Sequence, residues 1–150
     1  MKKGLLLGAS LLFLCGGCSF GGNKELVCTN TQSESGVSIA STAAMSFKSN
    51  KIANVKLTMD ITPDSDLMKE NWQLVEDAYN ELYASVDKDG VKVSTNVDSA
   101  NKKYTIIIES DPAKATKEDL EKYGMADLAG AEDTYEQTKK DLESEGYTCK

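Results

Sequence analysis

The sequence DLMKENWQLVEDAYNELYASV, residues 66–86, determines how the rest of the chain can fold. Its large apolar residues recur at steps of three and four, the spacing of one face of an α-helix. They are Met68, Trp72, Val75, Tyr79, Leu82 and Val86. This face is widened by Leu67, Leu74, Ala78 and Tyr83, and the other side of the stretch is polar. The spacing predicts one long amphipathic helix whose apolar face packs on the core.

Apolar and polar residues alternate on both sides of this stretch. Residues 37–47 and 55–61 alternate around a short turn at residues 49–51, which predicts an antiparallel hairpin with one buried face. One strand is expected before this hairpin, and two strands and two helices after the long helix: residues 24–31, 91–97, 104–109, 116–123 and 132–145. The order β-β-β-α-β-β-α-α predicts an α+β fold, with a mainly antiparallel sheet of about five strands and helices packed on one face.

The first residues follow the pattern of a lipoprotein export signal. Two lysines precede an apolar run of about eleven residues, too short to span a bilayer because crossing one takes about 20 residues. The run leads into Gly16-Gly17-Cys18, which resembles the bacterial lipobox, where small residues precede a cysteine that is acylated and becomes the first residue. We therefore expect a signal peptide at 1–17, a lipidated Cys18 with a short tether at 18–23, and one domain at 24–150.

Lipidation of Cys18 would hold the domain at the extracytoplasmic face of the bacterial cell membrane. A diacylglycerol and an amide-linked acyl chain together supply more than one lipid, which stable anchoring requires. Cys15 stands where the lipobox usually has leucine, which is a departure from the pattern. The alternative is an ordinary secretory signal cut near Gly17.

Two cysteines remain after the leader, Cys28 near the mature start and Cys149 one residue from the end. An even pair in an exported chain predicts a disulfide, which would close nearly the whole domain into one loop. The alternative is two free buried thiols. With no histidine in the chain, two cysteines alone do not make a metal site.

Charge and missing residue types narrow the function. The formal net charge is -7, and it becomes -9 once the two charges of Lys2 and Lys3 are lost with the leader. So acidic a surface repels phosphate, and we expect no nucleic-acid partner. The chain has no histidine, and its 17 basic residues are all lysine. These absences remove histidine-based catalysis, histidine metal sites and bidentate arginine clamps. We expect no catalytic residues, no cofactor and no metal, and thus not an enzyme.

Two acidic patterns could bind a cation, and we prefer a structural interpretation of both. Asp87-Lys88-Asp89-Gly90 resembles part of a calcium loop, but Asn96 stands where that loop needs glutamate. We interpret it as the turn at the exit of the long helix. The second pattern is Asp60, Asp64 and Asp66, of which the last two are placed to cap that helix.

Aromatic and hydroxyl residues offer two further candidate surfaces. Trp72, Tyr79 and Tyr83 could line a carbohydrate or peptide groove, but their helical spacing favours the core. Hydroxyl groups crowd the first strand of the hairpin and the turn before it: Ser33, Ser35, Ser38, Ser41 and Thr42. Ser41 interrupts the apolar face, which favours a strand at the sheet edge over a polar contact surface.

Three stretches carry a resemblance to a known family. They are MSFKSNKIANVKLTM at 45–59, the long helix after it, and YEQTKKDLESEGY at 135–147. Together they cover most of the mature domain and resemble the YehR-like lipoproteins, small bacterial surface proteins. The resemblance implies a lipid-anchored α+β domain and brings no catalytic residues. We do not associate the Cys28/Cys149 pair with that family, so the disulfide rests on spacing alone.

The leading functional hypothesis is a non-enzymatic binding or accessory module at the cell envelope, with an envelope protein or glycan as its partner. One alternative is a small hydrolase of cell-wall glycan that uses two carboxylates. Another is an inhibitor that plugs an envelope enzyme with a loop at residues 125–131.

Overall fold

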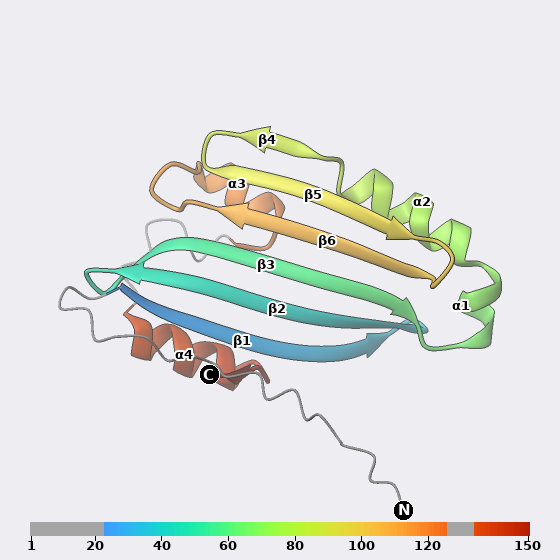
Figure 1. Cartoon of the computed structure of the whole chain (residues 1–150), viewed down its shortest axis with the longest axis horizontal. Coiled ribbons are helices and arrows are strands. Elements are labelled where there is room, and N and C mark those ends of the chain that lie inside the picture. Colours follow the sequence, from blue (N-terminus) through green and yellow to red (C-terminus); the bar gives the residue numbers. More distant parts are fainter. Residues whose placement is uncertain (1–22, 126–133) are drawn as a thin grey trace, which may run out of the picture.

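The computed structural model describes residues 23–125 and 134–150, which form one antiparallel sheet and four helices (Figure 1). The strands are β1 (Asn23–Glu34), β2 (Val37–Lys48), β3 (Lys51–Pro63), β4 (Val86–Lys88), β5 (Val91–Asp98), β6 (Lys103–Ser110) and β7 (Thr148–Cys149). The helices are α1 (Asp66–Glu70), α2 (Trp72–Leu82), α3 (Lys117–Lys122) and α4 (Tyr135–Ser144). The order across the sheet is β4-β5-β6-β3-β2-β1-β7, so β3 and β6 are neighbours although α1, α2, β4 and β5 separate them in sequence.

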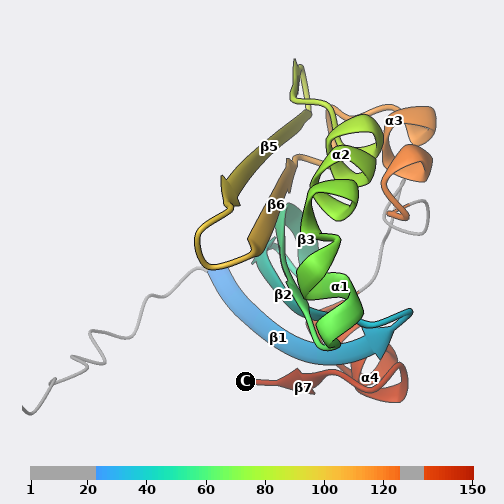
Figure 2. The ribbon, with the colours of Figure 1, turned by 90° about the vertical axis from the view of Figure 1, so that its right-hand side faces the viewer.

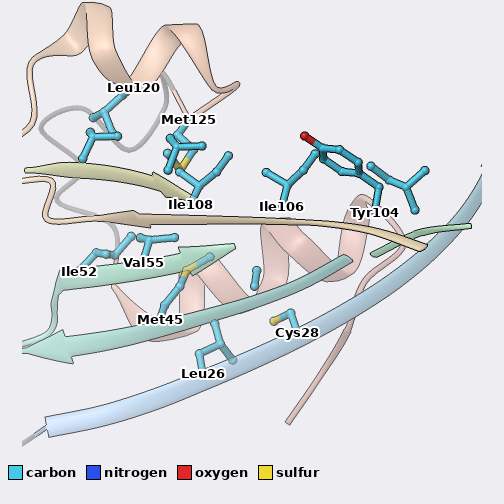
Figure 3. Packing of buried hydrophobic residues seen from close by; sticks show 14 of the residues in the cluster. Leu26, Cys28, Met45, Ile52, Val55, Tyr104, Ile106, Ile108, Leu120 and Met125 are labelled. Carbon is cyan, nitrogen blue, oxygen red and sulfur yellow. The ribbon is translucent and has the colours of Figure 1, made fainter. Parts of the chain in front are cut away.

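One face of the sheet is buried, because side chains alternate between its two faces. The row Cys28–Ala43–Leu57–Ile108–Val93 crosses five strands through directly paired residues on the inner face. Figure 2 shows the helices on that side of the curved sheet. Figure 3 shows inner side chains of the sheet and of the α3 region pointing into the same space, among them Leu26, Met45, Ile108 and Leu120. The expected placement of the helices on one face is confirmed.

The opposite face of the sheet is largely polar. Its central row runs Thr29–Thr42–Thr58–Ile107–Ser94 through the same strands. Four of these five side chains carry a hydroxyl group. This alternation explains why the long strands could be read from the sequence: each has one apolar and one polar face.

The expected strand count was wrong, because the sheet of the described residues has seven strands rather than about five. The two additional strands, β4 and β7, contain three and two residues. Such short segments have no room for a detectable alternation. Val86, expected at the end of the long helix, pairs with Val93 of β5 instead.

The long helix is also shorter than expected, and it is interrupted at Asn71, which caps both α1 and α2. The backbone N–H of Asn71 and its side-chain amide both donate to the Leu67 carbonyl, at 3.1 and 2.8 Å. The N–H of Leu74 donates to the Asn71 carbonyl three residues back, the spacing of a tighter 3₁₀ turn. This local turn separates the two helices.

Only part of the predicted apolar face is buried. Trp72 is buried, and four partly buried side chains of the same segment pack against the core: Met68, Val75, Tyr79 and Tyr83. The prediction was wrong for three core residues, since Leu67, Leu74 and Leu82 are 64%, 67% and 66% exposed. At 3.6 residues per turn, Leu74 lies roughly 160° around α2 from Trp72 and so cannot face the sheet with it. Glu76, only 5% exposed, lies within the buried arc instead.

Candidate functional site

Leu67 of α1 and Leu74 of α2 line an apolar groove with a volume of about 400 Å³, which we call the leucine groove. The hairpin between β1 and β2 forms the other wall through Ser35 and Val37. Figure 1 shows α1 beside this end of the two strands. The apolar helix residues that line the groove are Leu67, Met68, Leu74, Val75, Ala78 and Tyr79.

Local sequence holds the hairpin and α1 close together at one end of the groove. Ser65 caps α1 by accepting a hydrogen bond from the Met68 N–H at 3.3 Å. Gly36 adopts a φ of +83°, and a Cβ there would lie 2.8 Å from Ser65 Oγ and 3.0 Å from Met68 Cγ. Glycine is therefore needed both for the turn and for the close approach of the helix. The Asp64 N–H donates to the Gly36 carbonyl at 3.0 Å.

Tyr79 connects the groove to the core. Its ring centroid lies 5.6 Å from that of Tyr104 on β6 and 6.2 Å from that of Tyr83. The Tyr104 hydroxyl donates to Asn80 Oδ1 at 2.8 Å, which fixes α2 against β6. Of the three aromatic residues considered for a groove, Tyr79 lines one, whereas Trp72 and Tyr83 pack on the core.

Acidic side chains border the helix wall of the groove. Asp66 and Glu70 are four residues apart on α1, and Asp77 and Glu81 are four residues apart on α2. All four are exposed, and we call them the acidic stripe. Lys69 forms an ion pair with Asp66 at 2.9 Å, and the Lys102 ammonium donates to the Lys69 carbonyl at 2.8 Å. Glu70, Asp77 and Glu81 therefore carry most of the negative charge of the stripe.

A further carboxylate lies on the hairpin side, at Glu34. Burial, the neighbouring Tyr83 and the charge of Glu34 together raise the pKa of Tyr79. Glu34 is exposed at the end of β1, immediately before the turn that forms the second wall. The leucine groove thus has an apolar lining and carboxylates on both sides.

The acidic residues considered for a cation site are separated. Asp60 lies in β3, where it accepts a hydrogen bond from Thr105 at 2.7 Å and pairs with Lys103 at 2.9 Å. The capping interpretation of Asp64 and Asp66 was wrong, because the side chain of Ser65 caps α1. Within residues 23–125 and 134–150, no three metal-binding side chains of His, Cys, Asp or Glu come together.

The sequence Asp87-Lys88-Asp89-Gly90 belongs to the β4–β5 hairpin, with its turn at Asp89-Gly90. The expected turn at the exit of the long helix was therefore wrong, because α2 already ends at Leu82. Asp87 pairs with Lys92 of β5, and the Lys88 ammonium contacts Asp119 of α3 at 3.0 Å. The hydrogen bond and charge of Asp119 raise the pKa of Lys88. These contacts give the segment a structural role between β4 and α3.

The hydroxyl-rich strand was expected at the sheet edge, and this was wrong because β2 lies between β1 and β3. The hydroxyl residues of β2 are divided between the two faces: Ser38 and Thr42 lie on the open face, and Ser41 lies on the inner one.

A second hollow, of about 520 Å³, opens near the β4–β5 turn and is lined by Glu25, Lys56 and Glu109, among others. Lys56 and Glu109 pair within it at 3.4 Å, so its charges compensate one another.

Of the predicted site residues, Cys28 and Cys149 are joined in a disulfide, which confirms that prediction. Cys18 and the expected signal peptide lie outside the described residues, as do residues 126–131 of the expected inhibitory loop; Met125 is only 6% exposed. No helix of the described part of the chain has the length and apolar character needed to cross a bilayer.

The fold is α+β, with helices on one face of an antiparallel sheet and the other face open. Two solved structures share it. One, an NMR structure of a protein from Streptococcus pneumoniae TIGR4, has a TM-score of 0.57 and 14% identity, covering 100% of this chain and 97% of that one. The other, the NMR structure of the YehR protein of E. coli, has a TM-score of 0.53 and 17% identity, covering 85% and 92%. At these identities the likeness shows the fold alone, which agrees with the fold implied by the YehR resemblance. No protein-family model and no curated protein matches the chain.

Proposed function

We propose that this protein is a lipid-anchored binding module of the bacterial cell envelope and a YehR-like lipoprotein. Acylated Cys18 would hold it at the extracytoplasmic face of the membrane, and the leucine groove would bind its partner. The observation that carries the binding role is the exposure of Leu67 and Leu74 beside a groove of about 400 Å³. Contiguous exposed apolar surface on a soluble domain commonly marks an interaction site.

The position of the groove supports this proposal. β1 begins at Asn23, five residues after Cys18, and its 12 residues extend for about 40 Å at 3.3 Å per residue. The leucine groove lies beside Ser35 and Val37, just past the far end of β1. A chain anchored through Cys18 would therefore present the groove away from the lipid surface.

Lysines at the tether end support the same orientation. Lys24 follows Asn23 in β1, and Lys48 and Lys51 pair with each other across the β2–β3 turn. Lys48 also pairs with Asn23, so all three lysines lie where the tether enters the domain. Basic side chains near anionic headgroups contribute about 1 kcal/mol each to membrane association. The acidic stripe beside the groove lies at the other end of the sheet.

The disulfide favours an exported protein, because intrachain disulfides persist in oxidising compartments and are rare in reducing ones. The glycan-hydrolase alternative needs one carboxyl group with a raised pKa. In the described part of the chain, hydrogen bonds and nearby lysines hold the pKa below its ordinary value in Asp60, Asp66, Asp98 and Asp119. Hydrogen bonds and lysine charges outweigh burial in each. We therefore retain the binding role without an enzymatic one.

The anchor is tested by intact mass spectrometry of the chain purified from its native membrane. The expected mass starts at Cys18 and includes the added acyl chains, and it rises by about two daltons when reductant opens the Cys28–Cys149 bond. Cys18→Ala should remove the lipid mass, whereas Cys15→Ala, the matched control, should keep it. A native chain without lipid, or a lipid mass that survives Cys18→Ala, would overturn the anchor.

A further inference from the structure

We propose that the leucine groove binds a cationic amphipathic helix from a partner protein. Its apolar face would lie against Leu67 and Leu74, and its basic side chains against the acidic stripe. This inference rests on the proposed binding function and specifies the chemistry of the partner. It does not depend on the lipid anchor.

The apolar part of the inference comes from the exposed leucines. Leu67 and Leu74 are 64% and 67% exposed, seven residues apart on the same side of α1 and α2, with Ala78 four residues further on. All three residues line the leucine groove, so they form one apolar row along it. A second apolar surface laid along this row would remove both leucines from water without any rearrangement of the core.

The length of the row suits a helix. Leu67 and Ala78 are eleven positions apart on α1 and α2, which at the α-helical rise is about 16 Å, a length that three turns of a bound helix would match. A helix lying along this row would contact it through residues at positions i, i+3 or i+4, and i+7, the usual anchors of a helix bound in a groove. Val37 of β2 and Tyr79 of α2 supply the second wall and the floor.

Charge decides among the apolar partners that could cover the groove. Glu70, Asp77 and Glu81 border its helix side and Glu34 its hairpin side, while Lys69 is engaged with Asp66. A partner with lysine or arginine beside its apolar face complements these carboxylates. A second copy of this chain would bring like charge, because the net charge is -7, and a fatty acid or anionic lipid would place its head group among carboxylates.

The probes are three capped peptides of fourteen residues. The first contains leucine and lysine, with leucines at helical spacing. The second has glutamate in place of lysine. The third has the composition of the first, with leucine and lysine alternating so that no apolar helix face can form. The full chain, held in nanodiscs of zwitterionic lipid, is titrated calorimetrically with each peptide, and empty nanodiscs serve as the blank.

The helical lysine peptide should bind at least tenfold more tightly than either of the others. Its affinity should fall several-fold when the ionic strength rises from 0.05 to 0.5 M, because salt screens exposed charges. Equal binding of the glutamate peptide, or no binding of the lysine peptide, would overturn the proposal.

Two sets of variants locate the binding. Leu67→Ser combined with Leu74→Ser should lower the affinity for the lysine peptide at least tenfold. Leu82 is equally exposed on α2 but lies outside the groove, so Leu82→Ser should change this affinity less than twofold. Glu70→Gln with Asp77→Asn and Glu81→Gln should weaken binding about tenfold and flatten the salt dependence. Glu118→Gln with Glu136→Gln and Glu145→Gln makes the same change in net charge elsewhere on the surface and should have little effect. Equal losses in a variant and its control would overturn the proposal.

Failure of the groove and failure of the anchor give different results. If mass spectrometry finds no lipid, the chain is titrated in buffer with the same peptides, and the groove is tested without the anchor. If the lipid is present but the lysine peptide does not bind, the anchor stands and the proposed partner is wrong.

Discussion

Cys28 of β1 and Cys149 of β7 lie directly opposite each other and form a disulfide, although 121 positions separate them in sequence. β7 pairs with β1 through only two residues. Beyond them, the N–H of Lys150 donates to the Val27 carbonyl at 2.9 Å, and the Val27 N–H donates back at 3.2 Å. The disulfide thus supplements a very short strand pairing.

Removing this disulfide should lower stability substantially. Cys28→Ala with Cys149→Ala should reduce the free energy of unfolding by about 2–5 kcal/mol, because the unfolded chain is no longer closed into a long loop. Chemical denaturation measures the change, and the reduced wild type should unfold at a similar denaturant concentration. An unfolding midpoint that reductant leaves unchanged would contradict the prediction.

Replacing the buried Glu76 should stabilise the protein. Its Oε1 and the Nε1 of Trp72, four residues earlier, are buried and have no hydrogen-bond partner among residues 23–125 and 134–150. Glu76→Met keeps an unbranched side chain with good helix propensity and removes a buried polar group, so the free energy of unfolding should rise by about 1–2 kcal/mol. Glu81→Met, an exposed change on the same helix, is the control and should stay within about 0.5 kcal/mol of wild type. A loss of stability in Glu76→Met would show that the carboxylate has a partner.

Gly90 should be among the least replaceable glycines. It has a φ of +86°, and a Cβ there would overlap the backbone nitrogen of Ala115. Its carbonyl accepts a hydrogen bond from the Asp111 N–H at 2.9 Å, which holds the β4–β5 turn against the segment after β6. Gly90→Ala should therefore cost about 3 kcal/mol or more, since backbone must shift as well as adopt a strained φ.

The matched control for that substitution is Gly124→Ala. Gly124 also has a positive φ, +71°, but an added Cβ would meet no atom within 4 Å. This variant reports the conformational cost alone, about 1 kcal/mol. Equal losses at the two positions, measured by urea denaturation, would show that the turn can move away from Ala115.

The Asp60 carboxylate should stabilise the protein more at neutral than at acid pH. Burial opposes its ionisation, but the Thr105 hydrogen bond and Lys103 outweigh this effect and lower the pKa of Asp60. A carboxyl group with a lowered pKa in the folded state stabilises it above the unfolded pKa of about 3.9, and this stabilisation is lost as pH falls through the folded value. Asp60→Asn should be less stable than wild type at pH 7, and the difference should shrink at pH 3. A difference independent of pH would contradict this.

The sequence predicted those parts of the fold in which a single segment contains the whole signal. The strands β2, β3, β5 and β6 are long enough to show alternation, and their inner residues form the core. β4 and β7 escaped detection because their existence depends on pairing with distant residues, such as Val86 with Val93. Apolar spacing also located Trp72 correctly in the core.

The leucine groove could not be predicted from the same reasoning, since spacing records which residues are apolar but not which arc of the helix meets the sheet. Leu67 and Leu74 were assigned to the core for that reason. One signal was present: the apolar band of α1 and α2 is wider than one face of a helix can bury, and an acidic stripe runs beside it. Glu76 lies in the arc that meets the sheet, so part of this apolar band is left exposed to solvent.

The short ladder between β1 and the C-terminal residues has a practical consequence for attaching the protein to a surface. Because Lys150 pairs with Val27, a tag fused after it would emerge beside the first half of β1. A sensor chip loaded through such a tag would hold the molecule by the end opposite Leu67. Immobilised copies would then present the groove to the solution, where soluble partners can reach it.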